Sequence, residues 1–492
     1  MNFLRNNKVL LILFFSAFVL RLILVFTARS IATDGCSYIW LAEDILKGDF
    51  KSGINAYLPP LLPILTAGAS FIFGNLELSA RMVSCLAGSL TIFPLFLLVR
   101  DIFDKRVAIV TTIFYIIHPY LLQASAEVLT EALYFFLITS LAYILFKAIK
   151  SRKLILFMLV GLIAFLIFLA RPEGITVIVL VLGWIWFPNL SKIKKEYRWK
   201  LAASFFCLII YIVALLPFYL HFHKTTGSWK PTLRRVTFLD DRIENESWPD
   251  MIKRILKWKI SVNVPTLFSD IPQAYYPAFL IPLLFGLINR KSYKGFRAGE
   301  GFILSFILFR TFIITIFAGV ADRYFYALVP MALSWAGVGF WEINDRFLRN
   351  PKVKIQNIGK EKICTASIII FCIIVAACLP KGLRPIRANR ATQKAVGLWM
   401  KGNAGMSEFK IAARKPQEAF YAGAEFYCLK QGKYEDIIKQ IREEKADFLI
   451  VDKDIKTICP DFWDSMNEND LEPFSSKFED TNKEIIIYKI IK

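Results

Sequence analysis

The chain has 492 residues, of which 56% are hydrophobic, and its formal net charge is +21. Apolar runs recur from near the N-terminus to about residue 380, which excludes an ordinary soluble protein and predicts a polytopic membrane protein. The excess of Lys and Arg lies in short loops between these runs and is joined by no nucleic-acid-binding motif, so nucleic acid is excluded as a partner. The eight cysteines form no metal-type pair and indicate neither a disulfide framework nor a zinc site.

The apolar runs predict an all-α transmembrane domain over residues 1–380. About 11 segments have the length of a membrane-spanning helix, with about 13 as the upper number. Residues 60–73 are apolar but short, and we expect an interfacial or re-entrant piece there, because a full span would invert every later loop. Arg21, near the outer end of the first span, is expected to extend toward the lipid headgroups. The predicted spans are residues 8–28, 82–99, 106–123, 129–147, 154–170, 174–188, 201–220, 274–289, 302–319, 324–341 and 364–380.

Basic residues are distributed unevenly between the two sides of these spans. Loops on the side of the N-terminus carry about 24 Lys and Arg residues, whereas the other short loops carry about 6. Because basic loops remain in the cytoplasm, the N-terminus is predicted to be cytoplasmic in a cell (inner) membrane. The first loop (29–81), the loop 221–273 and the C-terminal segment then lie outside.

From residue 381 the composition becomes that of a small soluble domain. Residues 448–452 and 484–490 have the apolar character of strands, and residues 434–444 have the pattern of a helix that lies between strands of the chain. The segment 381–492 is therefore predicted to be a compact extracytoplasmic α/β domain.

The first outer loop begins with an aspartate, Asp34. Apolar residues from Tyr38 to Leu46 recur at helical spacing, which predicts a short amphipathic helix on the membrane surface that ends at Gly48. A carboxylate at the start of this helix would lie close to the headgroups and could act on a membrane-anchored substrate. The alternative is an ordinary helix-capping or interfacial carboxylate.

A second group of polar residues is expected at an outer membrane edge. Glu127 and Glu131 are four residues apart, which predicts one shared helical face, and His118 lies nearby in the sequence. Two carboxylates on one face can bind a metal ion or the hydroxyls of a sugar. The alternative is that both are simply solvated at the interface.

Several arginines lie in or next to the predicted spans. Arg310 falls near the middle of its span, where a charge costs about 2.5–3.5 kcal/mol on insertion scales, so it must face the bundle interior and find a partner. Arg171 and Arg323 lie at outer turns, where an arginine can hold a lipid phosphate in a bidentate manner or merely extend toward the headgroups.

Taken in chain order, these motifs resemble those of lipid-sugar glycosyltransferases of the GT-C superfamily. The similarity is greatest to the protein O-mannosyltransferase and aminoarabinose transferase branches and covers most of the chain, most strongly residues 30–175. The motifs are DGCSY at 34–38, YLPP at 57–60, ARMVS at 80–84, HPY at 118–120, LTE at 129–131, RPEG at 171–174, DRY at 322–324 and YAG at 421–423.

The resemblance implies transfer of a sugar from a polyprenyl-phosphate carrier to a lipid, glycan or protein acceptor outside the membrane. It implies that Asp34 is the catalytic base or a metal ligand, and leaves the need for a divalent metal ion open. The remaining candidates are residues for the acceptor, a metal or the sugar (Glu127, Glu131, His118 and Tyr38) and residues for the donor phosphate (Arg81, Arg171, Arg310, Arg323 and Tyr324).

Two departures from the family pattern leave the donor sugar open. Gly35 stands where many relatives have a second acid, and Tyr57 and Leu58 stand where the aminoarabinose branch has charged residues. A polysaccharide polymerase or ligase is the nearest alternative function. A transporter of lipid-linked sugars is more distant, because the chain lacks the two related halves with interrupted spans that such a protein uses.

Overall fold

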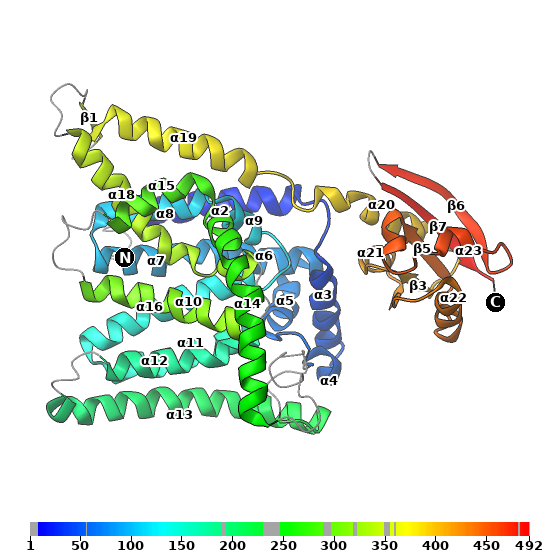
Figure 1. Cartoon of the computed structure of the whole chain (residues 1–492), viewed down its shortest axis with the longest axis horizontal. Coiled ribbons are helices and arrows are strands. Elements are labelled where there is room, and N and C mark those ends of the chain that lie inside the picture. The colour runs from blue at the N-terminus through cyan, green and yellow to red at the C-terminus, as the bar shows by residue number, and fades with distance from the viewer. Residues whose placement is uncertain are drawn as a thin grey trace. The chain divides into compact units, whose positions relative to one another are not determined.

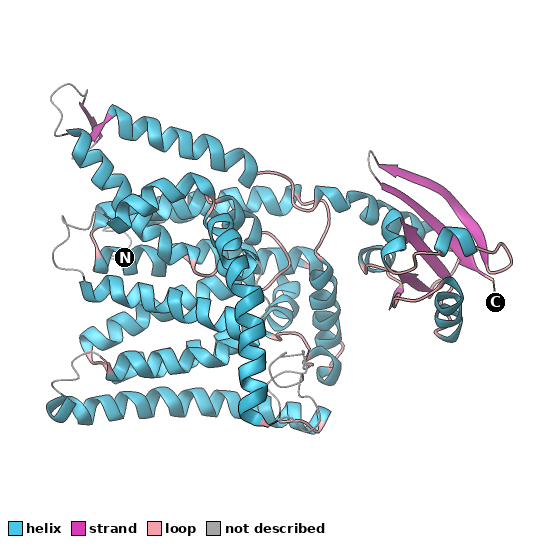
Figure 2. Cartoon of the chain, in the orientation of Figure 1, coloured by secondary structure: helices cyan, strands magenta, loops and turns pink. Residues whose placement is uncertain are grey.

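The computed structural model describes residues 8–55, 57–187, 193–229, 247–288, 297–317, 322–348, 355–358, 361–480 and 483–491 (Figures 1 and 2). The chain divides into two compact units. The first comprises Met1–Val25 and Leu41–Arg384, and the second comprises Phe26–Trp40 and Pro385–Lys492. The second unit thus takes in the start of the first loop together with the C-terminal segment.

The first unit is built of helices, and a two-stranded hairpin, β1 (Ile355–Ile358) and β2 (Glu361–Cys364), precedes its last helix. Among them α10, α11 and α13 lie side by side (Figure 1). The helices are α2 (Lys8–Thr27), α3 (Thr33–Leu46, whose first turns belong to the second unit), α4 (Phe50–Gly53), α5 (Leu61–Phe73), α6 (Leu76–Leu90), α7 (Ile92–Ile102), α8 (Lys105–Ile117), α9 (Pro119–Ala124), α10 (Glu131–Ser151), α11 (Leu154–Ala170), η1 (Pro172–Thr176), α12 (Val177–Trp186), α13 (Ile193–Thr226), α14 (Trp248–Tyr275), α15 (Pro277–Ile288), α16 (Arg297–Phe317), α17 (Asp322–Phe325), α18 (Val329–Leu348) and α19 (Thr365–Gly382).

Within the described residues, six helical segments are long and apolar enough to cross a membrane, or seven if the bent pair α14–α15 forms one span. The predicted multi-span helical architecture is therefore confirmed, whereas the predicted number of about 11 spans is not. Residues 61–73, 154–170 and 172–186 form shorter apolar helices. The six segments are Lys8–Thr27, Leu76–Ile102, Glu131–Ser151, Glu196–Thr226, Gly299–Ile316 and Thr365–Gly382.

Two predicted segments differ from the observed helices for identifiable reasons. The span expected at 106–123 breaks at His118, because Pro119 cannot continue the hydrogen-bond ladder and instead begins α9. The outer loop expected at 221–273 contains the end of α13 and nearly all of α14, while residues 230–246 lie outside the described part of the chain.

Lipid-facing and buried helices differ clearly in their surfaces. The exposed side of α13 carries large apolar residues such as Phe205, Val213 and Leu216, each more than half exposed, which is the surface expected of a helix that contacts lipid. By contrast α18 is buried from Val329 to Asn344. Its Gly339 approaches α15 so closely that a Cβ atom there would lie 1.8 Å from the Pro282 carbonyl oxygen, so this crossing requires glycine.

The prediction that Arg21 extends toward the headgroups is wrong. Its side chain is fully buried, it donates from Nη1 to the Ala17 carbonyl oxygen at 3.2 Å, and its guanidinium lies 5.0 Å from the centre of the Tyr115 ring. Gly88 makes room for it, because a Cβ atom there would lie 3.0 Å from Arg21 Nε. An aromatic face and a carbonyl thus replace water around this cation.

The second unit contains a five-stranded mixed sheet in the order β4-β3-β5-β7-β6. Strand β3 is parallel to β4 and β5, whereas β7 is antiparallel to β5 and β6. The predicted strands at 448–452 and 484–490 and the helix at 434–444 are confirmed. The elements are η4 (Ala388–Arg390), α20 (Ala391–Asn403), β3 (Lys410–Ala413), α21 (Gln417–Ala422), β4 (Glu425–Cys428), α22 (Tyr434–Glu443), β5 (Phe448–Asp452), η5 (Lys453–Thr457), α23 (Phe462–Ser465), β6 (Leu471–Asp480) and β7 (Lys483–Ile490).

Side-chain alternation along β3 and β5 gives this sheet a core on each face. Ile411 and Ile450 pack with apolar residues of α20 and α21, whereas Ala412 and Leu449 pack with the apolar residues of α22. Because neighbouring residues of a strand point to opposite faces, each strand serves both cores, and residues 411–413 and 448–451 are all apolar.

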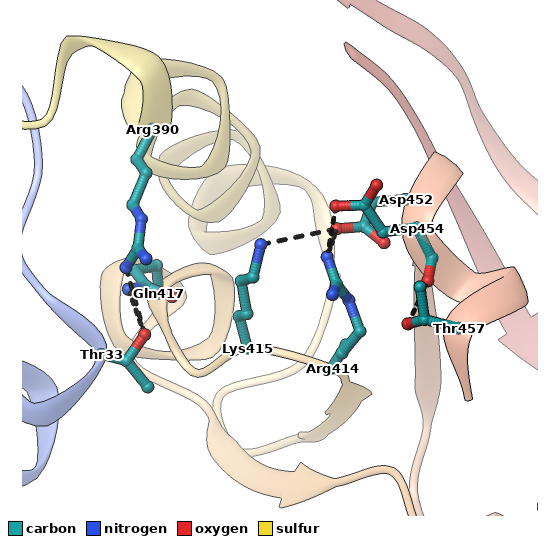
Figure 3. A network of polar contacts seen from close by, with 8 residues as sticks. All are labelled: Thr33, Arg390, Arg414, Lys415, Gln417, Asp452, Asp454 and Thr457. Atoms are coloured by element: carbon teal, nitrogen blue, oxygen red, sulfur yellow. Dashed lines mark hydrogen bonds and ion pairs between the residues drawn. The ribbon is translucent and has the colours of Figure 1, made fainter. Parts of the chain in front are cut away.

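Charged residues follow the carboxyl ends of the parallel strands (Figure 3). Arg414, directly after β3, donates from Nη2 to carboxylate oxygens of Asp452 at 2.8 Å and Asp454 at 2.6 Å. Glu418, on α21, is almost fully buried, with Oε2 unpartnered in the described structure. Burial, and then the nearby Asp452 charge, raise the pKa of the Glu418 carboxyl to about 7.

The raised pKa of Glu418 predicts a pH-dependent stability of the C-terminal domain. Because the folded state holds this proton more tightly, the contribution is fully present below the ordinary pKa of 4.5 and is lost as pH rises through about 7. The loss approaches about 3 kcal/mol, since one pKa unit is 1.36 kcal/mol.

Glu418→Gln mimics the protonated acid and does not titrate. The stability of this variant relative to wild type, measured by comparing the unfolding midpoints of the two proteins, should therefore increase between pH 5 and pH 8. An equal pH dependence in both proteins would contradict the prediction.

Candidate functional site

A network of buried charges joins three parts of the first unit. Arg171 donates from Nη2 to Glu131 Oε1 at 2.8 Å and lies 3.5 Å, through Nη1, from Glu173 Oε1. Arg310 donates from Nη2 to the same Glu173 oxygen at 2.9 Å. Arg310 is 5% exposed, so the prediction that it faces the bundle interior and finds a partner is confirmed, and the partner is Glu173.

Two tyrosines supply aromatic faces to these arginines. The guanidinium carbons of Arg171 and Arg310 lie 5.5 and 4.8 Å from the centre of the Tyr134 ring. Arg171 also lies 5.1 Å from the centre of the Tyr324 ring. Such faces stabilise a desolvated cation without consuming its N–H donors. We call Glu131, Tyr134, Arg171, Glu173, Arg310 and Tyr324 the arginine cluster.

The turn after α11 positions two members of this cluster. Arg171 has an extended backbone (φ −154°, ψ 128°), as expected for a residue before proline, so α11 ends at Ala170. Pro172 then begins the short helix η1, which carries Glu173. A Cβ atom on Gly174 would lie 2.7 Å from the Ile167 carbonyl oxygen, so this tight return also needs glycine.

The arginine cluster retains unused hydrogen-bonding capacity. Arg171 Nε, Arg310 Nε and Glu131 Oε2 are buried and have no hydrogen-bond partner among the described residues. Unsatisfied buried polar groups are uncommon, and they are found where a protein binds a polar ligand or performs chemistry. Two N–H donors of delocalised cations suit an anionic oxygen, such as that of a phosphate.

Arg81 and Glu127 lie outside this cluster. Arg81 is buried, pairs with Glu77 at 2.8 Å and donates to the Ala126 carbonyl oxygen at 2.9 Å, so it holds the turn between α9 and α10. Glu127 lies in that turn and is half-buried. The prediction that Glu127 and Glu131 share a helical face is wrong, because α10 begins only at Glu131.

His118 has a local structural role. Its Nδ1 accepts from the Leu121 backbone N–H at 3.4 Å, which leaves the proton on Nε2, and Nε2 lies 3.2 Å from the Tyr275 carbonyl oxygen. The ring also stacks on Phe279. Both ring nitrogens are therefore occupied, and neither is available to a metal ion.

Arg323 and Tyr324 come from the short helix α17. The Arg323 guanidinium lies 5.4 Å from the centre of the Tyr324 ring, the same ring that Arg171 contacts. Tyr324 packs against the apolar cluster of Ala274, Ile314, Phe325 and Leu328, which fixes the position of its ring. Arg323 therefore adjoins the arginine cluster through Tyr324.

Asp34 and Tyr38 belong to the second unit, in the first turns of helix α3. The predicted helix is confirmed at Thr33–Leu46, and Gly48 follows it with a positive φ of 82°. Asp34 is half-buried and Tyr38 is buried one turn later on the same face. A carboxylate in the first turn is favoured by the partial positive charge of the helix N-terminus.

The sequence motifs pointed to the arginines but not to all of their partners. Glu173 and Tyr134 were not among the predicted site residues, although Glu173 stands in the RPEG motif and a buried Arg310 required an acid. Among the described residues, no group of three or more His, Cys, Asp or Glu side chains is arranged to hold a metal ion. Glu131, one of the proposed metal ligands, is instead bonded to Arg171.

Comparison with known proteins identifies related sequences and folds. Residues 58–216 match the family model of dolichyl-phosphate-mannose-protein mannosyltransferases. A search of curated proteins finds no significant match. Among solved structures, ArnT of Cupriavidus metallidurans, bound to undecaprenyl phosphate, is similar with a TM-score of 0.65, 12% sequence identity and 97% coverage of both chains.

The oligosaccharyltransferase of Archaeoglobus fulgidus, solved with zinc and sulfate, is also similar. Its TM-score is 0.61 at 13% identity, over 91% of this chain and 68% of that one. At these identities the structural matches show a shared fold. The family model and the fold together confirm the resemblance indicated by the motifs: the chain is similar to the membrane glycosyltransferases of the GT-C superfamily, enzymes that use lipid-linked sugar donors.

Proposed function

We propose that this protein is an inverting membrane glycosyltransferase that moves a sugar from a polyprenyl-phosphate donor to an acceptor hydroxyl or phosphate on a lipid, glycan or protein. The arginine cluster carries the proposal, because Arg171 and Arg310 hold unused N–H donors in a buried setting within a fold that lipid-sugar transferases share. The solved relatives support a lipid-phosphate donor: one ArnT structure contains undecaprenyl phosphate, and one archaeal oligosaccharyltransferase structure contains dolichol-phosphate.

The proposed reaction uses an acid and several cations. The Asp34 carboxylate accepts the proton of the acceptor hydroxyl while the oxygen attacks the anomeric carbon of the sugar. The bond between that carbon and the phosphate oxygen breaks, and the polyprenyl phosphate leaves with the electron pair. Arg171 and Arg310, with Arg323 and Arg81 as further candidates, stabilise the negative charge that develops on the leaving phosphate.

The distribution of basic loops supports an assignment of this reaction to the outer face of a cell membrane. With the N-terminus in the cytoplasm, the loop that bears Asp34 and the segment 381–492 are outside. A polyprenyl carrier is anchored in the bilayer, so its phosphate lies at headgroup depth, where Asp34 and the outer turns are also expected.

Asp34→Asn is expected to abolish transfer while leaving expression and thermal stability unchanged, because the amide keeps the size of the side chain but cannot take a proton. The measurement is transfer from radiolabelled polyprenyl-phosphate sugars to membrane extract by purified protein. Asp44→Asn, on the same helix, is the matched control and should remain active. Full activity of Asp34→Asn would contradict the assignment of Asp34 as the catalytic base.

Arg310→Gln is expected to lower the rate of transfer by roughly 100- to 1000-fold, which is the usual effect of removing one preorganised group that stabilises a developing negative charge. It should also destabilise the protein by about 3–5 kcal/mol, because it breaks a buried ion pair.

The double variant Arg310→Gln/Glu173→Gln removes both charges and should recover much of the stability, measured as the thermal midpoint, without recovering transfer. If activity returned together with stability, Arg310 would be a structural partner of Glu173 and not a phosphate ligand.

A further inference from the structure

We propose that Gln417 and Arg390 of the C-terminal domain are positioning residues for Asp34. This inference rests on the proposed function, in which Asp34 is the catalytic base. All the contacts that carry it lie within the second unit, where residues 26–40 and 385–492 pack together. The domain is then part of the catalytic apparatus, because it orients the carboxylate.

Gln417 caps the start of helix α3 from a distant part of the sequence. One end of its side-chain amide lies 3.0 Å from the Thr33 backbone nitrogen and 3.2 Å from Thr33 Oγ1, and it also faces Arg390 Nη1. These three neighbours can donate a hydrogen bond, whereas the Ile31 carbonyl oxygen, 3.3 Å from the same end, can only accept. Because donors outnumber acceptors around it, this end of the amide is assigned as its oxygen. The first N–H groups of a helix have no partner within the helix, and here the Gln417 oxygen accepts from one of them.

Arg390 reinforces the same turn. It donates from Nη1 to Thr33 Oγ1 at 3.1 Å, so Thr33 is contacted by both side chains (Figure 3). Gln417 is completely buried, which means that its amide is held by packing and has few alternative orientations. Thr33 directly precedes Asp34, and the direction of the Asp34 side chain therefore depends on how this turn is held.

Two further contacts attach α3 and the residues that precede it to the domain, one on each side of Asp34. The Arg29 backbone N–H donates to the Ile386 carbonyl oxygen at 2.9 Å. The Trp40 ring packs with the rings of Phe420 and Phe426, at centroid distances of 6.1 and 6.2 Å. Because these contacts dock the helix without touching the first turn, loss of the Gln417 cap should disturb the turn locally while the domain remains in place.

The test compares Gln417→Met, which keeps the length of the side chain but has no acceptor, with Gln417→Glu, which retains an acceptor oxygen for Thr33 and Arg390. Gln431, which is exposed in a turn of the same domain, provides the matched control variant Gln431→Met. Transfer is measured with radiolabelled polyprenyl-phosphate sugars, and thermal midpoints are recorded for each protein.

Gln417→Met should lower kcat by roughly 10- to 100-fold, as expected when a catalytic group is displaced by about 1 Å, with the KM for the donor changed by less than about threefold. Gln417→Glu should restore most of the rate, and Gln431→Met should match wild type.

Asp34→Asn in the same assay separates the two proposals. If Asp34→Asn is active, the proposed base is wrong, and the positioning role falls with it. If Asp34→Asn is inactive while Gln417→Met has the wild-type kcat, only the positioning role is overturned. A fall in the thermal midpoint that Gln417→Glu does not reverse, with an equal loss of rate in both Gln417 variants, would also overturn it by showing a purely structural contact.

Discussion

The arrangement of the first unit depends on neutralising charges inside an apolar helical bundle. Arg310 stands within a membrane-type helix, and a lone cation there would be expensive to bury. Glu173 balances it at 2.9 Å, Arg171 shares the same carboxylate oxygen, and Glu131 balances Arg171 in turn. Because these residues come from α16, from the turn after α11 and from the start of α10, the ion pairs specify how those elements meet.

The charge balance within the arginine cluster also bears on the proposed chemistry. Two arginines and two glutamates give a neutral set, so the cluster is stable without a ligand. The tyrosine faces and shared carboxylate nevertheless leave the Nε donors of both arginines unpartnered in the described structure. A neutral cluster with spare donors can accept a phosphate oxygen without a large rearrangement, which is the preorganisation that stabilises a developing charge.

The second unit meets a different constraint, the orientation of one carboxylate at a helix start. The first N–H groups of a helix have no partner within the helix and need acceptors from elsewhere. The C-terminal domain supplies the acceptor Gln417 and the donor Arg390, which lie 384 and 357 residues after Thr33 in the chain. Its sheet, apolar on both faces, provides the rigid support for α21.

By itself the sequence determined the properties that depend on local pattern, because apolar periodicity and the cost of burying a charge can be read from each segment alone. These properties are the multi-span helical class, helix α3 with its end near Gly48, the strands at 448–452 and 484–490, and the burial of Arg310. Only the tertiary structure decided the features that depend on distant residues. Glu173 as the partner of Arg310, the burial of Arg21 against Tyr115, and the cap that Gln417 places on Thr33 each join segments far apart in the chain. Glu127 does not share a helical face with Glu131, because the turn before α10, which Arg81 holds, interrupts the helix. Spacing specifies neighbours within one helix, whereas the partner of a buried polar group is chosen by the packing of the whole unit.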